Sequence, residues 1–309
     1  MKARDVLSLS QFDSTSISHL FQETDRIISL HEAGKAIPHG LNGRIIALLF
    51  FEPSSRTFGS FSSAVKRLGG ATIEIHDSKN LSASKGESFH DTIKTFESYS
   101  DGLIIRHPLI GSVARAAGIA EIPVINAGDG IGEHPTQALL DLYTIRKHHK
   151  RLDNLKVVVG GDLLNGRTVH SLLKGLSMHK GNEIYLLAPS ELRLESELET
   201  EFTKAGLKLH TIESEDDIPG DADIWYWTRV QKERFVKEDD YEKVKNRFIV
   251  TPELMEKKAQ KDMILMHPLP RVGEITEDVD TDPRAVYFEQ MRNGLFLRMA
   301  LLNSVFSNA

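Results

Sequence analysis

The sequence predicts an α/β protein with two doubly wound parallel-sheet domains, and three observations support this prediction. Short runs rich in β-branched and aromatic residues alternate with amphipathic helical runs, as in parallel sheets covered by helices on both faces. The length of 309 residues suits two domains better than one. Polar and charged clusters follow the strand-like runs directly, where open α/β sheets bind their ligands.

Nine runs are expected to be strands, and they fall into two series. Apolar stripes at helical spacing lie between them, such as the one formed by Phe61, Val65 and Leu68. The first series is at 44–51, 71–75, 102–107 and 123–128, and the second is at 155–162, 182–189, 207–212, 222–228 and 262–268.

Two long helical runs are expected to join the two domains. One spans 134–150, with Pro135 suited to its first turn, and the other spans about 285–306. We therefore expect one domain at 1–134 plus 292–309 and a second at 135–291, with the active site in the cleft between them.

Composition and charge exclude several classes of protein. With 40% hydrophobic residues the chain can bury a core, and its net charge of -6 does not favour a nucleic-acid binder. The chain contains no cysteine, which excludes disulfides and thiolate metal sites. No apolar run approaches the roughly 20 residues that span a bilayer. We expect a soluble cytoplasmic protein that binds neither nucleic acid nor membrane.

The run FFEPSSRTFGSF at 50–61 concentrates hydrogen-bond donors where a strand is expected to turn into a helix. Free N–H groups and a partial positive charge at a helix N-terminus attract anions, and an arginine fork matches phosphate oxygens. An N-cap serine beside a surface arginine explains this run alone equally well. The glycines of a P-loop are missing. The donors are Ser54, Ser55, Arg56 and Thr57.

Each remaining cluster, taken alone, has an ordinary structural explanation. Arg106 ends an apolar run as a strand-end arginine does, and His134 could simply cap the helix at Pro135. The segment at 160–171 lacks the G-x-G-x-x-G spacing of a dinucleotide site. The thirteen histidines are scattered and form no metal-binding motif. We expect no metal and no cofactor.

Taken together and in order, these motifs resemble the catalytic chain of aspartate carbamoyltransferase over nearly the whole sequence. That family transfers the carbamoyl group of carbamoyl phosphate to L-aspartate, the first committed step of pyrimidine biosynthesis. The motifs are FFEPSSRT, SxxKGES, RHP, NAGDG with EHPTQALLDLYTI, GDLLNGRTVHSL, TRVQKER, HPLPRVGEI and NGLFLRMALL.

The resemblance implies a role for each cluster, with no protein nucleophile. The catalytic residues implied are Arg56, Thr57, Arg106 and His134. The residues implied to bind carbamoyl phosphate are Ser54, Ser55, Arg56, Thr57, Arg106, His134, Gln137 and the backbone of Leu269 and Pro270. The residues implied to bind aspartate are Lys85, Arg167, Arg229 and Gln231, with Ser82 and Lys85 reaching in from a neighbouring subunit.

The resemblance also implies a homotrimer with shared active sites, a possible separate regulatory chain, and a cis peptide before Pro270. Relatives commonly have threonine in place of Ser55 and arginine in place of Phe58. Because Phe58 continues an apolar stripe, we expect it to pack rather than to bind phosphate. We also expect Glu52 to pair with Arg167 or Arg234 across the cleft.

Two other functions compete with this one. An ornithine carbamoyltransferase would typically carry H-C-L-P where this chain has HPLP, and Arg229 with Gln231 would serve a cationic amino acid poorly. A protein that binds carbamoyl phosphate or a nucleotide without catalysis would be expected to lose one of the implied catalytic or aspartate-binding residues, and Arg56, Arg106, His134 and Arg229 are all present.

Overall fold

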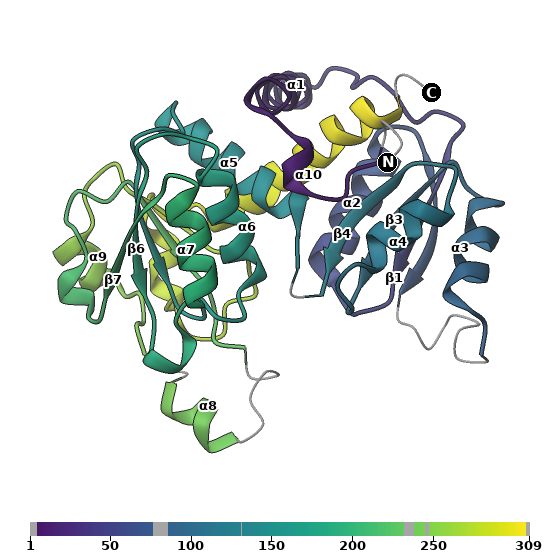
Figure 1. Ribbon diagram of the computed structural model, residues 1–309. Coiled ribbons are helices and arrows are strands. Elements are labelled where there is room, and N and C mark those ends of the chain that lie inside the picture. The colour runs from purple at the N-terminus through teal and green to yellow at the C-terminus, as the bar shows by residue number, and fades with distance from the viewer. Residues whose placement is uncertain (1–4, 77–85, 131, 232–237, 245–246, 307–309) are drawn as a thin grey trace. The chain divides into compact units, whose positions relative to one another are not determined.

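The computed structural model describes residues 5–76, 86–130, 132–231, 238–244 and 247–306 (Figure 1). The chain divides into two compact units, which we call unit 1 (Met1–Leu140 with Arg292–Ala309) and unit 2 (Asp141–Met291). The division falls inside two helices, α5 (Pro135–His149) and α10 (Tyr287–Phe306). Both helices lie close to the positions predicted from the sequence.

Unit 1 contains a four-stranded sheet in the order β2-β1-β3-β4, and each neighbouring pair is parallel. Five of the six residues of β1 are fully buried, which is typical of a parallel strand covered on both faces. α2 packs against β1 and β2, while α4 packs against β3 and β4. The bounds are α1 (Ser14–Glu32), β1 (Ile45–Phe50), α2 (Ser55–Arg67), β2 (Ala71–His76), α3 (Phe89–Glu97), β3 (Gly102–His107), α4 (Ser112–Ile119) and β4 (Val124–Asp129).

Unit 2 contains a five-stranded sheet in the order β7-β6-β5-β8-β9, again with parallel pairing throughout. The order places β5 and β8 side by side in the middle of the sheet. The bounds are β5 (Lys156–Gly160), α6 (Arg167–Leu176), β6 (Glu183–Leu187), α7 (Ser196–Lys204), β7 (Lys208–Ile212), β8 (Ile224–Trp227), α8 (Glu238–Val244), α9 (Pro252–Lys258) and β9 (Ile264–Met266).

The predicted α/β class with two parallel sheets is confirmed, and each of the nine predicted runs overlaps a strand. The first helix, α1, had no counterpart in the prediction. It begins after Asp13, whose carboxylate accepts a hydrogen bond from the backbone N–H of Ser16 at 2.7 Å, a typical N-cap. Among the described residues, no helix is both long enough and apolar enough to cross a membrane.

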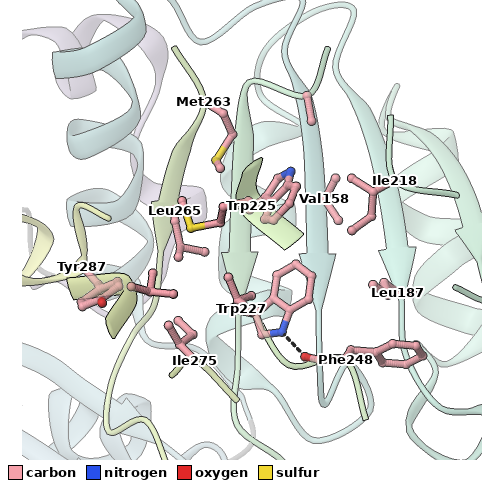
Figure 2. Packing of buried hydrophobic residues seen from close by; sticks show 14 residues of the cluster. Val158, Leu187, Ile218, Trp225, Trp227, Phe248, Met263, Leu265, Ile275 and Tyr287 are labelled. Atoms are coloured by element: carbon pink, nitrogen blue, oxygen red, sulfur yellow. Dashed lines mark hydrogen bonds between the residues drawn. The ribbon is translucent and has the colours of Figure 1, made fainter. Parts of the chain in front are cut away.

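Two tryptophans on β8 fill the core of unit 2, as Figure 2 shows. Trp225 and Trp227 are both fully buried, and their ring centroids lie 5.8 Å apart. The indole N–H of Trp227 donates to the backbone oxygen of Phe248 at 2.7 Å. The indole nitrogen of Trp225 is buried without a hydrogen-bond partner in the described part of the chain. The two rings therefore share a core but differ in one hydrogen bond.

This difference predicts that Trp227→Phe destabilises the protein more than Trp225→Phe does. Both changes remove similar apolar volume, but only the first leaves the Phe248 oxygen buried and unpaired, at a cost of about 1–3 kcal/mol. The measurement is urea unfolding followed by circular dichroism. Equal losses of unfolding free energy in the two variants would show that the indole hydrogen bond contributes nothing.

Candidate active site

In unit 1 the polar clusters lie where the parallel strands end. β1 and β3 are neighbours, with Phe50 paired in register with Arg106. The backbone N–H of Phe51 donates to the backbone oxygen of Arg106 at 2.8 Å, just before the chain turns into α2. The cluster that follows β1 and the arginine that ends β3 are therefore held at the same edge of the sheet by backbone pairing.

The N-terminus of α2 lacks the side-chain cap that a serine usually provides. Ser54 has the extended backbone of an N-cap residue, but its side chain makes no capping hydrogen bond to this helix. A serine that served only as a cap would accept a bond from a backbone N–H of the first turn. The Ser54 hydroxyl is therefore not engaged in capping this helix, and the N-terminus of a helix attracts anions. Ser54 therefore lacks the side-chain hydrogen bond that an ordinary N-cap serine would make.

Thr57 and His134 meet inside unit 1, although 77 residues separate them. The Thr57 hydroxyl lies 3.4 Å from Nε2 of His134, and both residues are buried. His134 immediately precedes α5, and its backbone oxygen accepts from the N–H of Gln137 at 2.9 Å. Gln137, in the first turn of α5, is buried as well. Hydrogen-bonding side chains that follow β1 and β4 are thus brought together away from solvent.

Arg106 is a buried cation with defined partners, not a snorkelling surface arginine. Only 7% of the residue is exposed. Its Nη2 lies 2.5 Å from Oε1 of Glu52, and its Nη1 donates to the backbone oxygen of Ala127 at 3.3 Å. Gly128 allows this packing, since a Cβ there would lie 2.9 Å from Nη1 and the backbone φ of +131° favours glycine.

Two side chains next to this cluster, Glu52 and Phe58, have contacts that can be compared with the prediction. Glu52 has a partner that the sequence did not indicate, Arg106. Its pairing with Arg167 stays a prediction, and Arg234 lies outside the described residues. Phe58 packs as expected, with edge-to-face ring contacts to Phe50 at 5.1 Å and to His76 at 4.8 Å.

Helix α2, which follows Ser54, is fixed to the sheet by a carboxylate that was not predicted from the sequence. One oxygen of Glu74 on β2 accepts from Ser62 and Lys66 of α2 at 2.6 and 2.8 Å. It also accepts from the hydroxyl of Thr72 at 2.7 Å. Burial raises the pKa of Glu74, but the bonds from Lys66, Ser62 and Thr72 lower it more, to about 2.

In unit 2, Asp162 organises the loops that follow β5 and β8. This fully buried aspartate accepts from the backbone N–H of Asn165 at 2.9 Å and lies 3.5 Å from the backbone nitrogen of Gln231. The amide of Gln231 donates to the backbone oxygen of Asn165 at 3.0 Å. Burial raises the pKa of Asp162, and the hydrogen bonds that it accepts from Asn165 and Gln231 only partly offset this rise.

These contacts bring Gln231 next to the start of α6, where Arg167 is the first residue. The residue before it, Gly166, has no side chain to cap the helix. Arg229 lies between Thr228 and Gln231 and is partly exposed. Three residues implied to bind aspartate are therefore carried by two loops that Asp162 ties together.

The turn after β9 carries Leu269 and Pro270, with the cis peptide that the resemblance implied. Leu269 has a positive φ of 54°, uncommon for a residue with a side chain. The remaining candidates, Ser82 and Lys85, lie outside the described residues. Within the described residues, no group of three or more histidines, cysteines or carboxylates is placed to bind a metal ion.

Comparison with known protein families gives two matches that together cover most of the chain. Residues 4–147 match the carbamoyl-phosphate-binding domain of the aspartate/ornithine carbamoyltransferases. Residues 153–305 match the aspartate/ornithine-binding domain of the same family.

Individual relatives agree with the family match over almost their whole length. The aspartate carbamoyltransferase catalytic subunit of Hyperthermus butylicus is 46% identical over 301 residues, covering 97% of this chain and 95% of its own. That of Thermococcus onnurineus is also 46% identical, over 303 residues, covering 97% of this chain and 96% of its own.

Solved structures agree with the fold as well. The catalytic subunit of M. jannaschii aspartate transcarbamoylase superposes with a TM-score of 0.91 at 41% identity, covering 99% of this chain and 98% of that chain. The Trypanosoma cruzi enzyme in complex with carbamoyl aspartate and phosphate gives a TM-score of 0.90 at 39% identity, covering 98% of this chain and 96% of that chain.

The Glu74 contacts predict an acid-dependent loss of stability. Because the folded pKa of about 2 lies below the ordinary 4.5, the charged carboxylate stabilises the fold above about pH 4.5, and this contribution is lost as the pH falls toward 2. Glu74→Gln should therefore be less stable than the wild type at pH 7, and the difference should shrink in acid. Urea midpoints of both proteins across this range test it, and a difference independent of pH would contradict it.

Proposed function

The chain belongs to the aspartate/ornithine carbamoyltransferase family, and we propose that it transfers a carbamoyl group from carbamoyl phosphate to the α-amino group of L-aspartate. The products are N-carbamoyl-L-aspartate and phosphate, which places the reaction at the first committed step of pyrimidine synthesis. The observation that carries the proposal is the uncapped N-terminus of α2, with buried Thr57 and His134 in contact beside it.

The phosphate of carbamoyl phosphate binds at the start of α2. The backbone N–H groups of the first turn and the hydroxyls of Ser54 and Ser55 donate to its oxygens, and Arg56 adds a guanidinium fork. The partial positive charge of the helix end also stabilises the phosphate as it leaves. Support comes from Ser54, whose hydroxyl is not engaged in capping this helix.

The carbamoyl carbonyl is held by Thr57, Arg106 and His134. These three donors stabilise the negative charge that develops on the carbonyl oxygen during attack. Gln137 and the backbone of Leu269 and Pro270 bind the rest of the carbamoyl group. The burial of Thr57 and His134 supports this role, because donors shielded from water are stronger.

Aspartate carries two carboxylates, which Arg167 and Arg229 bind together with Gln231. The side chain of Gln231 already donates to the loop that precedes Arg167. Lys85, with Ser82, reaches the site from a neighbouring subunit of a homotrimer. These cations offset the repulsion between two anionic substrates, so that much of the catalysis lies in holding them together.

The reaction needs no covalent intermediate with the protein. The lone pair of the uncharged α-amino group forms a C–N bond with the carbamoyl carbon. The C–O bond to phosphate then breaks, its electron pair leaves with the phosphate, and the proton lost by the nitrogen is taken up by the departing phosphate as hydrogen phosphate. We also propose a cytoplasmic location and a separate regulatory chain. The regulatory chain is supported by two relatives that are named catalytic subunits.

The direct test measures product from carbamoyl phosphate with L-aspartate or with L-ornithine as acceptor. We expect N-carbamoyl-L-aspartate with the first and no citrulline with the second, because Arg229 and Gln231 suit an anionic acceptor. Phosphate release and the ureido product are scored in parallel. Citrulline formation would reject the acceptor assignment, and phosphate release without either product would reject the transfer reaction.

Removing the Thr57 hydroxyl should slow the reaction without unfolding the protein. Thr57→Val keeps the shape but deletes one donor to the developing oxyanion, so we expect kcat to fall by about 10²-fold. Thr57→Ser keeps the hydroxyl and serves as the matched control, with kcat close to that of the wild type. Equal kcat in the two variants would remove Thr57 from the oxyanion site.

A further inference from the structure

The turn after β9 is held by a buried histidine–glutamate pair that the proposed reaction does not use directly. His267 and Glu274 are 1% and 6% exposed, and Nε2 of His267 lies 2.7 Å from Oε1 of Glu274. We propose that this pair is a positioning device, which sets the backbone of Leu269 and Pro270 for the amino group of the carbamoyl substrate. The inference rests on the function proposed above and names a further specificity element for it.

The hydrogen bonds determine the tautomer of His267. The backbone N–H of Leu269 donates to Nδ1 of His267 at 2.7 Å, so Nδ1 carries a lone pair and no proton. The proton of the neutral ring is then on Nε2, from which it is donated to Glu274. The imidazole thus accepts from the turn on one side and is oriented by the carboxylate on the other.

Glu274 also holds the far side of the same turn. Its second oxygen, Oε2, accepts from the backbone N–H of Val272 at 2.8 Å. Burial raises the pKa of Glu274, but the bonds from His267 and Val272 outweigh it and lower the pKa below its ordinary value. With both oxygens accepting, the carboxylate is ionised. One side-chain pair therefore binds the N–H of Leu269, directly before Pro270, and that of Val272, two residues after it.

A third backbone N–H bond fixes the start of the turn. The backbone N–H of His267 donates to Oε1 of Gln290 on α10 at 3.0 Å. The amide of Gln290 donates in turn to Asp141 on α5 at 2.7 Å, and the hydroxyl of Tyr226 donates to the other oxygen of Asp141 at 2.9 Å. All three side chains are fully buried. The turn is thus tied to α5, β8 and α10 of unit 2.

This arrangement leaves the turn suited to one kind of ligand group. The N–H of Leu269 donates to His267, and Pro268 and Pro270 have no N–H, so these three residues have no backbone N–H to offer a ligand. The ligand can then be met by carbonyl oxygens, which accept hydrogen bonds and do not donate them. An uncharged NH₂ group offers the donors that such acceptors need, whereas a phosphate oxygen would be repelled. The turn therefore selects the amino end of a carbamoyl group.

Stability alone is a weak reason for this pair. Burying an ionised carboxylate beside a neutral imidazole carries a desolvation cost that an apolar pair of similar volume would avoid. What the pair supplies is orientation, because each heteroatom is matched to a particular backbone or side-chain partner.

Two variants of His267 separate positioning from packing. In His267→Asn the amide oxygen occupies a place near Nδ1 and can still accept from Leu269, while the bond to Glu274 is lost. In His267→Gln the amide nitrogen occupies a place near Nε2 and can still donate to Glu274, while the acceptor for Leu269 is lost. Both shrink the buried side chain, and both should lower the melting temperature.

We expect His267→Gln to weaken carbamoyl phosphate binding about tenfold or more, the loss that one hydrogen bond of this kind produces. His267→Asn should stay within a few-fold of the wild type. Binding of inorganic phosphate should be unchanged in both, because its proposed ligands lie in unit 1. The measurement is calorimetric titration with freshly prepared carbamoyl phosphate and, separately, with inorganic phosphate.

The proposal is overturned if the two variants bind carbamoyl phosphate equally, or if phosphate binding falls in parallel. The variant Glu274→Gln gives a second test. The glutamine amide has one acceptor oxygen and one NH₂ group, so its NH₂ group must face the N–H donor of either His267 or Val272 and lose that hydrogen bond. This variant should weaken binding of carbamoyl phosphate and leave binding of inorganic phosphate unchanged, and the opposite pattern would also overturn the proposal.

Because binding is measured without turnover, wild-type protein that binds carbamoyl phosphate but forms no product would reject the proposed function alone. Wild-type protein that binds no carbamoyl phosphate would reject both.

Discussion

Parallel strand pairing is the constraint on which every part of the candidate site depends. In each sheet the strands run in one direction, so their carboxyl ends share an edge and the segments that follow them are neighbours in space. Backbone register alone then brings Arg106 next to the turn that opens α2, and the segment after β5 next to the one after β8. Side-chain contacts refine an arrangement that the backbone has already made.

The strands and the clusters after them were predictable because both signals are local. A buried parallel strand is a short apolar run, and the residues after it are read directly from the sequence, as with β1 and Ser54–Thr57. The same local signals existed for α1, with an N-cap at Asp13 and buried Ile17, Phe21 and Ile28 at helical spacing, but the sequence analysis did not use them. The information that defines α1 is therefore present in the local sequence.

Partners distant in the sequence were not predictable in this way. Nothing near Glu52 indicates that its carboxylate meets Arg106, and nothing near Glu74 indicates that it accepts bonds from α2. Such contacts depend on how a helix lies over a strand, which the sequence pattern leaves open. For Phe58 the pattern was sufficient, since its apolar stripe and its ring contacts agree. The roles of the site residues came from the resemblance to a known family. No single cluster indicated its own role by residue type and spacing alone.

The two tryptophans of the chain both lie on β8, in the core of unit 2. Their spectroscopic consequence is that the intrinsic tryptophan emission of this protein comes from one unit alone. Unfolding or ligand binding confined to unit 1, where α2 and Arg106 lie, has no tryptophan of its own to report it. A change in emission on adding an amino acid substrate reports the environment of β8, whose following loop carries Arg229 and Gln231. Tryptophan fluorescence therefore reports on unit 2 and not on unit 1.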